Sequence, residues 1–204
     1  MAMAKLYGAD AIRYYISANL PENKEGNFTW DGFIAGVNNE LVANLGNLIN
    51  RTLKFWESKF AGKLDHEGLV LPEDIANKIK HVYTNMQENL DNCEFVAALE
   101  ELMQYSRFGN KYFDDKKIWE VIKTDPIKAK QTMFELLYIV TQFPILMAPF
   151  LPQAATKLAS LLQIKIEKWE EVTMIPSGLT EPVTILFNKL DMEKVLAQKD
   201  NLNG

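Results

Sequence analysis

A polar stripe lies along one face of the helix that the sequence predicts from residue 30 to residue 60. At about 100° per residue, the stripe falls within an arc of roughly 80° and consists of Asn44, Asn47, Arg51, Lys54 and Ser58. It contains amides, a guanidinium and an ammonium but no carboxylate. Amide and guanidinium groups form paired hydrogen bonds with base edges, and Arg and Lys also hold phosphates. The stripe indicates either a surface that contacts unpaired bases or an ordinary solvated face.

Trp119 is a second candidate for such chemistry. It follows the charged sequence Asp114-Asp115-Lys116-Lys117, which we expect to form a turn after a helix from Glu94 to Tyr112. An indole at that position would be partly exposed, and an exposed indole can stack an unpaired base with a gain of about 1 to 3 kcal/mol. The alternative is that Trp119 clamps the entry to the next segment.

The other reactive residues do not indicate catalysis. The sequence has no phosphate-binding Gly-x-x-x-x-Gly-Lys loop, no dinucleotide-binding glycine motif, no His-Glu-x-x-His and no Gly-x-Ser-x-Gly. Cys93 lacks a basic partner nearby in the sequence, so we expect it to be a small buried side chain. His66 and His81 are expected to be solvated. The chain alone is therefore predicted to be non-catalytic, with no metal site and no cofactor of its own.

Composition limits the class of protein further. The 204 residues carry 22 Lys and Arg against 27 Asp and Glu, a formal charge of −5, which excludes a nucleic-acid binder that works by uniform positive charge. Any such contact must be local. No apolar stretch is long enough to cross a membrane, and a single cysteine favours a reducing compartment. We therefore expect a cytoplasmic protein that does not span a membrane.

Apolar residues recur at helical spacing through most of the chain, which predicts an all-α antiparallel bundle. The expected helices cover residues 4–18, 30–60, 72–92, 94–112, 125–146 and 151–162. The helical body thus spans about 4–162, and residues 163–204 form a tail with an extended stretch at 181–187 and a short helix at 190–198. We expect this tail to pack back on the bundle, so that residues 1–204 form one domain.

Three stretches of the sequence carry a family resemblance. Residues 7–15, with the sequence YGADAIRYY, resemble the segment that joins the catalytic domain to the helical bundle in class I aminoacyl-tRNA synthetases. Residues 39–51 (NELVANLGNLINR) and 110–120 (NKYFDDKKIWE), followed by Ile185-Leu186-Phe187, resemble in order and spacing the anticodon-binding domain of methionyl-tRNA synthetases. The likeness extends from about residue 6 to residue 190.

The resemblance implies which residues read the nucleic acid. In that family an Asn and an Arg one helical turn apart, with a Trp after a later helix, recognise the CAU anticodon, and these correspond to Asn47, Arg51 and Trp119. Lys54 and Lys111 are then candidates for phosphate contacts. The family usually has Pro immediately before the Trp, where this chain has Ile118.

The resemblance also implies partners outside this chain. The family's catalytic signatures and zinc-binding cysteines are missing, so the chain is expected to be the recognition part of a longer methionine-tRNA ligase that uses ATP and Mg²⁺. Its partners would be the anticodon loop of tRNA(Met) and the parent's own catalytic domain. Two alternatives stay open: the equivalent domain of a class I synthetase for Cys, Ile or Val, and a helical protein-interaction module suggested by the tail at 181–190.

Overall fold

The computed structural model describes residues 2–22, 27–193 and 195. Within these ranges the chain forms helices and loops, with one isolated β-bridge between Lys63 and Gly178. The predicted all-α fold is confirmed. The helices are α1 (Ala2–Tyr7), α2 (Ala9–Ala18), α3 (Trp30–Gly36), η1 (Val37–Gly46), α4 (Asn47–Lys59), α5 (Glu73–Asp91), α6 (Phe95–Lys116), α7 (Ile118–Thr124), α8 (Pro126–Val140), α9 (Phe143–Met147) and α10 (Pro152–Leu162).

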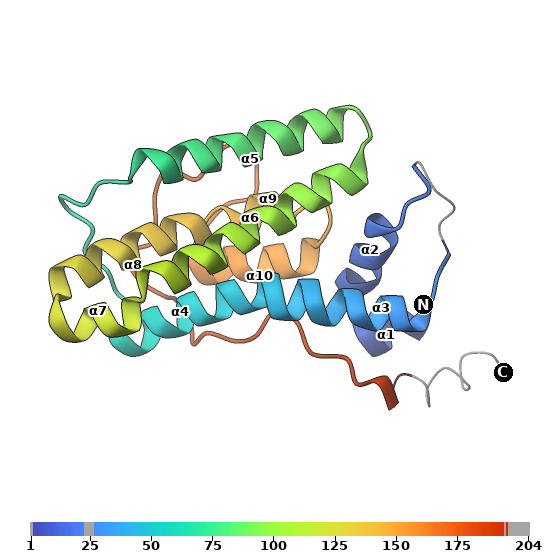
Figure 1. Ribbon diagram of the computed structural model, residues 1–204, viewed down its shortest axis with the longest axis horizontal. Coiled ribbons are helices and arrows are strands. Elements are labelled where there is room, and N and C mark those ends of the chain that lie inside the picture. Colours follow the sequence, from blue (N-terminus) through green and yellow to red (C-terminus); the bar gives the residue numbers. More distant parts are fainter. Residues whose placement is uncertain (1, 23–26, 194, 196–204) are drawn as a thin grey trace.

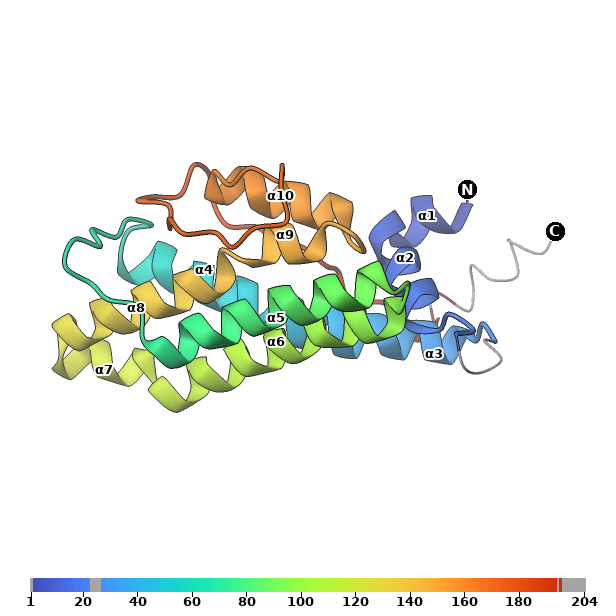
Figure 2. The ribbon, with the colours of Figure 1, turned by 90° about the horizontal axis from the view of Figure 1, so that it is seen from above.

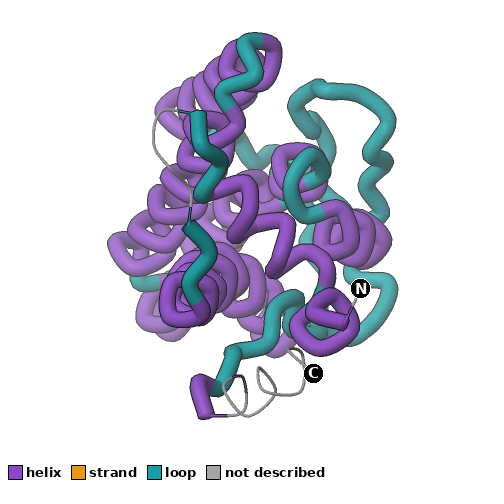
Figure 3. The backbone as a smooth tube through the Cα atoms, turned by 90° about the vertical axis from the view of Figure 1, so that its right-hand side faces the viewer, coloured by secondary structure: helices purple, strands orange, loops and turns teal. Residues whose placement is uncertain are grey.

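The long helices share one general direction along the molecule. Helices α4, α6 and α8 follow its long axis, and α5 lies along α6 (Figure 1). Seen from above, α9 and α10 lie on the side of the bundle opposite α5 and α6 (Figure 2). An end view shows the helices packed together with loops around them (Figure 3). The largest fully buried side chains include Phe33, Trp56, Tyr105 and Phe143. Because these come from four different helices, the core joins the whole bundle.

The predicted helix from 30 to 60 is present as a continuous rod made of α3, η1 and α4. Thr29 begins it, since its hydroxyl accepts a hydrogen bond from the Gly32 amide at 3.1 Å. The middle part, η1, is wound as a π-helix, in which each turn holds more residues than in an α-helix. Gly46 permits this winding, because a Cβ there would lie 2.7 Å from the Leu41 carbonyl oxygen.

Two expected helices are each interrupted. The helix predicted over residues 4–18 is divided into α1 and α2 at Gly8, whose φ of 86° is accessible to glycine but strained for other residues. The helix predicted over 125–146 ends at Val140, and α9 begins separately at Phe143. Pro144 explains the second break, because it has no amide proton and its ring clashes with the carbonyl four residues earlier.

The segment between α6 and α8 also differs from the expectation. The charged sequence from Asp114 to Lys116 is not a turn but the last turn of α6. The corner is one residue, Lys117, in the left-handed conformation with φ 44° and ψ 46°. A further helix, α7, follows directly and was not predicted. The fully buried Ile118 is its first residue and fixes it on the bundle.

The tail after α10 packs back on the bundle, as predicted, through side chains that bind its backbone. The side chain of Gln142 pairs with both backbone groups of Val172, at 2.9 and 3.0 Å. Further along, the Val183 amide donates to Glu57 at 2.9 Å. The predicted extended stretch at 181–187 is not helical and forms no strand. Of the predicted helix at 190–198, residues 192, 193 and 195 are helical, and residues 194 and 196–198 lie outside the described residues. In the part of the chain that is described, no helix is long and apolar enough to cross a membrane.

Candidate functional site

Helices α4 and α6 lie against each other and carry most of the candidate residues. Their close approach depends on Gly109, because a Cβ at that position would lie 2.4 Å from Cδ2 of Leu48. Leu48 is fully buried beneath α6. Its neighbour in sequence, Asn47, points to the surface, as does Asn110 in part. The packing of one glycine therefore brings two amide side chains together at the edge of the interface.

Asn47 and Arg51 both contact α6. Nδ2 of Asn47 donates a hydrogen bond to Oδ1 of Asn110 at 3.1 Å. One terminal nitrogen of Arg51 forms an ion pair with Oδ1 of Asp114 at 2.8 Å, and the other donates to the backbone carbonyl of Asn110. The predicted one-turn spacing thus directs both side chains to the same partner helix.

An aromatic ring connects Arg51 with Trp119. The guanidinium carbon of Arg51 lies 4.2 Å from the centroid of the Phe113 ring, a cation–π contact. The same ring stacks with Trp119, with centroids 5.7 Å apart and planes inclined by 20°. Trp119 remains 38% exposed, in agreement with the expectation of a partly exposed indole.

An open groove of about 640 Å³ lies between α6 on one side and the consecutive helices η1 and α4 on the other. We call it the α4–α6 groove; its lining includes Asn44, Asn47, Arg51, Arg107, Asn110, Lys111 and Asp114. Trp119 is not part of this lining and joins the groove through Phe113. The structure therefore brings together the three residues that were predicted to act together.

Lys54 and Lys111, the two predicted phosphate contacts, are each paired with an acid. Lys54 lies 2.8 Å from Glu57, and Lys111 lies 3.6 Å from Asp115. Only Lys111 lines the groove. At the far end of the groove, Arg107 pairs with Glu40 and Glu100, at 3.0 Å each. Partial burial opposes the charged form of Arg107, but the two acids raise its pKa above the usual value.

The polar stripe is not free of carboxylates in the folded protein, although the sequence suggested that it would be. The stripe has no acid within its own face, but Asp114 from α6 pairs with Arg51. Asn44, expected on the same solvated face, is buried and donates to the Met103 carbonyl at 3.1 Å. The π-helical winding of η1 is the reason, since a fixed 100° per residue does not apply there.

Three residues that line the groove or contact its lining were not predicted as site residues: Asn110, Phe113 and Asp114. All three lie on α6, which also carries other polar and aromatic residues, so their residue types alone do not distinguish them. A second pair one turn apart, Asn110 and Asp114, mirrors the spacing of Asn47 and Arg51. That mirrored spacing could have indicated a role for Asn110 and Asp114, and all three residues lie in the stretch 110–120 that carries the family resemblance.

The other reactive side chains remain apart from the groove. Cys93 is exposed, not buried as predicted, because it lies in the left-handed corner between α5 and α6 with φ 60°. His66 and His81 are exposed, as expected. Within the described residues, no three His, Cys, Asp or Glu side chains are grouped closely enough to hold a metal ion.

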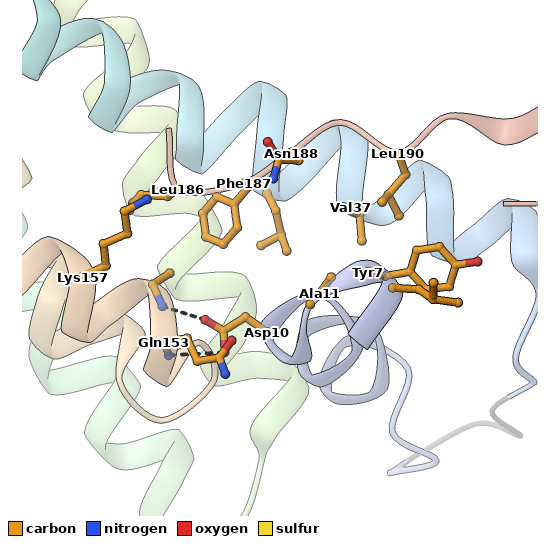
Figure 4. A pocket seen from close by; sticks show the side chains of 14 residues that line it. Tyr7, Asp10, Ala11, Val37, Gln153, Lys157, Leu186, Phe187, Asn188 and Leu190 are labelled. Carbon is orange, nitrogen blue, oxygen red and sulfur yellow. Dashed lines mark hydrogen bonds between the residues drawn. The ribbon is translucent and has the colours of Figure 1, made fainter. Parts of the chain in front are cut away.

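A second cavity of about 350 Å³ lies where α2, η1, α10 and the tail meet. Figure 4 shows Asp10 directed at the first turn of α10, where it accepts hydrogen bonds from the amides of Gln153 and Ala154 at 3.4 and 2.7 Å. This carboxylate satisfies amides that a helix N-terminus leaves unpaired. The contact therefore joins α2 to α10 and is structural.

Comparison with known proteins adds a family to this geometry. Residues 60–204 match the family described as the anticodon binding domain of methionyl tRNA ligase. The chain belongs to this family. Residues 1–53 match a second family, the class I tRNA synthetases of the methionine type. Asn47 and Arg51 lie in the region matched by the class I synthetase family, and Lys111 and Trp119 lie in the region matched by the anticodon-binding family. The α4–α6 groove is therefore formed between the two matched regions.

Relatives in the methionyl-tRNA ligase family cover nearly all of the chain. Methionine–tRNA ligase 2 from Bacillus cereus strain ATCC 14579 is 32% identical over 97% of it, and the ligase from Bacillus cereus strain B4264 is 34% identical over 97%. In both cases the aligned part is 36% of the relative. The chain thus spans about a third of the length of these methionine–tRNA ligases.

Solved structures of methionyl-tRNA synthetases share the fold. The apo form of the enzyme from Mycobacterium tuberculosis superposes with a TM-score of 0.81 over 93% of this chain and 40% of that one. The same enzyme bound to methionyl-adenylate gives 0.81 over 92% of this chain and 39% of that one. Sequence identity is 20% in both, so these matches establish the helical architecture.

Proposed function

We propose that this chain recognises the CAU anticodon of tRNA(Met) in the α4–α6 groove. The observation that supports this best is the continuous contact from Arg51 through Phe113 to Trp119, next to the amide of Asn47. An unpaired base needs a flat surface for stacking and polar groups for its edge. Trp119 offers the first, and Asn47 and Arg51 offer the second.

Lys54 and Lys111 are the phosphate-side contacts in this proposal. Their ion pairs are exposed, and exposed pairs contribute at most about 1 kcal/mol. A phosphate can therefore replace Glu57 or Asp115 as the partner of the ammonium group at little cost. Lys54 lies on α4 together with Asn47 and Arg51, and Lys111 lies on the facing helix α6.

The recognition module proposed here serves a longer methionine-tRNA ligase in the cytoplasm. Activation of methionine with ATP and Mg²⁺ would take place in the part of that enzyme that this chain does not include. The module's partners are then the anticodon loop and the catalytic part of the same enzyme. Membership of the methionyl-tRNA ligase family favours this assignment over a synthetase for Cys, Ile or Val.

The protein-interaction alternative loses its motivating feature in the structure. The tail at 181–190 is held by the bundle: Val183 is 4% exposed, and Asn38 pairs with both backbone groups of Leu190 at 2.9 and 2.8 Å. A tail held in this way does not offer a free docking strand.

The test is a titration of the chain with two anticodon stem-loop RNAs, one with CAU and one with UAU. We expect the CAU stem-loop to bind about tenfold more tightly or better, since one mismatched hydrogen-bonding edge costs about 1.4 kcal/mol or more. Trp119→Ala is expected to weaken binding about 5- to 150-fold, which corresponds to the loss of one stacked base.

Phe95→Ala is the matched control for the loss of an aromatic side chain. Phe95 is 38% exposed, as Trp119 is, but it lies at the other end of α6. The control should bind like the unaltered chain. Equal affinity for the two stem-loops, together with no loss in Trp119→Ala, would contradict the proposed function.

A further inference from the structure

The side chain of Asn110 has only one possible orientation. Its Nδ2 lies 3.0 Å from the backbone carbonyl of Asn44 and 3.2 Å from that of Ser106. Backbone carbonyl oxygens accept hydrogen bonds and never donate them, so the atom that faces them must be the amide nitrogen. Oδ1 of Asn110 therefore faces the other way, toward Asn47.

The side-chain amide of Asn44 is also held in one orientation by its hydrogen-bond partners. Its Nδ2 donates to the Met103 carbonyl at 3.1 Å and to a carboxylate oxygen of Glu40 at 3.0 Å, and both of these are acceptors. Its Oδ1 is therefore left to accept from Nδ2 of Asn110, at 3.2 Å. Three amides thus form a row, Asn47 to Asn110 to Asn44, in which each donates to the next.

The row determines what Asn47 presents to a ligand. Because Oδ1 of Asn110 can only accept, Asn47 must direct its Nδ2 toward that oxygen, and the two atoms are 3.1 Å apart. Its own Oδ1 is then directed away from Asn110, and within the described residues no donor is bonded to that oxygen. An isolated surface Asn can rotate its amide by 180° at little cost, whereas Asn47 is held with its acceptor toward solvent.

Arg51, one turn along α4, can present only donors. The groove therefore offers an acceptor on Asn47 next to donors on Arg51. Cytosine carries the complementary pattern on its pairing edge, with a donating amino group beside an accepting ring nitrogen, and adenine has the same order. Uracil and guanine carry a carbonyl oxygen and a ring N–H at these positions. Their carbonyl oxygen would face the acceptor of Asn47, and their ring N–H would face the donors of Arg51, so neither hydrogen bond could form.

We infer that Asn110 and Asn44 are positioning residues that set base specificity, by holding Asn47 with its acceptor outward so that the groove selects a base with an amino-type edge. This inference rests on the proposed function and adds to it the source of the selectivity. Neither residue needs to touch the RNA for this effect.

The test compares Asn110→Ala with Asn110→Asp, with the ratio of CAU to UAU affinity as the readout. Alanine frees the amide of Asn47 to rotate, and we expect the ratio to fall about tenfold, the effect of losing one oriented hydrogen-bonding pattern. Aspartate presents an acceptor to Asn47 with either oxygen, so the ratio should stay within about threefold of the original. Its second carboxylate oxygen would face the Asn44 and Ser106 carbonyls, which are acceptors too, so this variant is the less stable of the two.

This pair separates specificity from stability. If Asn110 merely supported the fold, the aspartate variant would lose selectivity as much as the alanine variant or more, and that result would overturn the inference. Asn110→Ser is a third variant that fills part of the space and also frees Asn47, so a lowered ratio is expected even if Asn110→Ala does not fold. An unchanged ratio in Asn110→Ser would overturn the inference.

Asn85→Ala provides the control for removal of a surface amide. The side chain of Asn85 bonds to His81 on its own helix, at 3.0 Å, so its removal should leave the ratio of CAU to UAU affinity unchanged. Failure of the proposed function has a different signature, because the unaltered chain would then bind CAU and UAU stem-loops equally. If the unaltered chain discriminates but the Asn110 variants discriminate just as well, only the role of the amide row is refuted.

Discussion

Arg51 is held by three different contacts before any ligand arrives. Asp114 pairs with one terminal nitrogen, the Asn110 carbonyl accepts from the other, and the guanidinium plane lies over Phe113. A side chain fixed in this way loses little further conformational entropy on binding. The cost is that a carboxylate lies next to the position where RNA, itself an anion, would bind.

The ion pair with Asp114 can be tested by Asp114→Ala. The Arg51 side chain is 23% exposed and that of Asp114 is 62% exposed, so the pair should contribute no more than about 1 kcal/mol to folding. Loss of a negative charge should raise affinity for both stem-loops, while a less ordered Arg51 should lower the CAU to UAU ratio. Asp115→Ala removes the same charge from the same helix without touching Arg51, and should leave the ratio unchanged. A ratio that is equal in both variants would contradict the positioning role.

The sequence predicts part of this site, and the limit lies in long-range contacts. Spacing on one helix was enough to place Asn47 beside Arg51, and the position after a helix was enough to expose Trp119. Asp114 could not be identified as the partner of Arg51, because the two are 63 residues apart. Only the packing of α4 against α6 brings that carboxylate to the guanidinium.

At the scale of elements, the distance between α4 and α6 determines whether the groove exists. Gly109 sets it, since any larger residue would press on Leu48 and on Ile139, whose Cγ2 lies 3.2 Å from an added Cβ. The helix α6 itself was predicted, but its length and the corner at Lys117 were not. The charged residues from Asp114 to Lys117 indicate exposure to solvent, but both a loop and the last turn of a helix can be exposed. The sequence therefore did not predict α7 or the place of Trp119 within it.

Gly109→Ala is therefore expected to destabilise the chain by about 1 to 3 kcal/mol. Alanine is the better helix former by up to about 1 kcal/mol, but the overpacking of a buried interface outweighs this gain. The displacement of α6 should also separate Asn110 from Asn47 and weaken CAU binding. Urea denaturation and the stem-loop titration measure the two effects. Gly36→Ala is the control. An added Cβ at Gly36 would lie 3.3 Å from the Tyr14 ring, at a site that does not line the groove, so this variant should leave binding intact. Unchanged stability and binding in Gly109→Ala would refute the role of this contact.

The link between α4 and the tail should depend on pH through Glu57. Hydrogen bonds from Lys54 and then from the Val183 amide lower the pKa of Glu57 below its usual value of 4.5. A lowered folded-state pKa means that the stabilisation is fully present above the unfolded-state value and is lost as pH falls through the folded-state value. The stability difference between the chain and Glu57→Gln should thus be constant near neutral pH and shrink below about pH 4.5. Urea midpoints across this range, with Glu181→Gln as a tail control, measure it. A difference that does not change with pH would contradict the assignment.

At the scale of the whole molecule, an acidic chain carries a groove of mixed charge. The formal charge is −5, and the cations around the groove are matched by Glu40, Asp114 and Asp115. The course of the tail over this molecule was predicted only in outline. Its path depends on side chains such as Gln142 and Asn38, which are far away in the sequence and show no pattern that would pair them with it.

This balance of charge predicts a weak dependence of binding on salt. With two or three cations facing phosphates, the logarithm of the affinity should fall with the logarithm of salt concentration with a slope of about −1 to −2. Titrations at several salt concentrations measure the slope. Lys111→Ala should make it shallower by somewhat less than one unit for a phosphate contact to single-stranded RNA, while Lys165→Ala, in the loop after α10, should not change it. A slope several times steeper would show that general electrostatic attraction dominates binding.

The most direct test of the account locates the RNA on the protein. Nuclear magnetic resonance spectra of the isotopically labelled chain, recorded during titration with the CAU stem-loop, report on the indole N–H of Trp119 and the side-chain amide of Asn47. We expect these signals and those of the backbone amides along the facing parts of α4 and α6 to shift together, and to shift much less with the UAU stem-loop. Shifts confined to α5 or to the cavity around Asp10, with Asn47 and Trp119 unaffected, would contradict it.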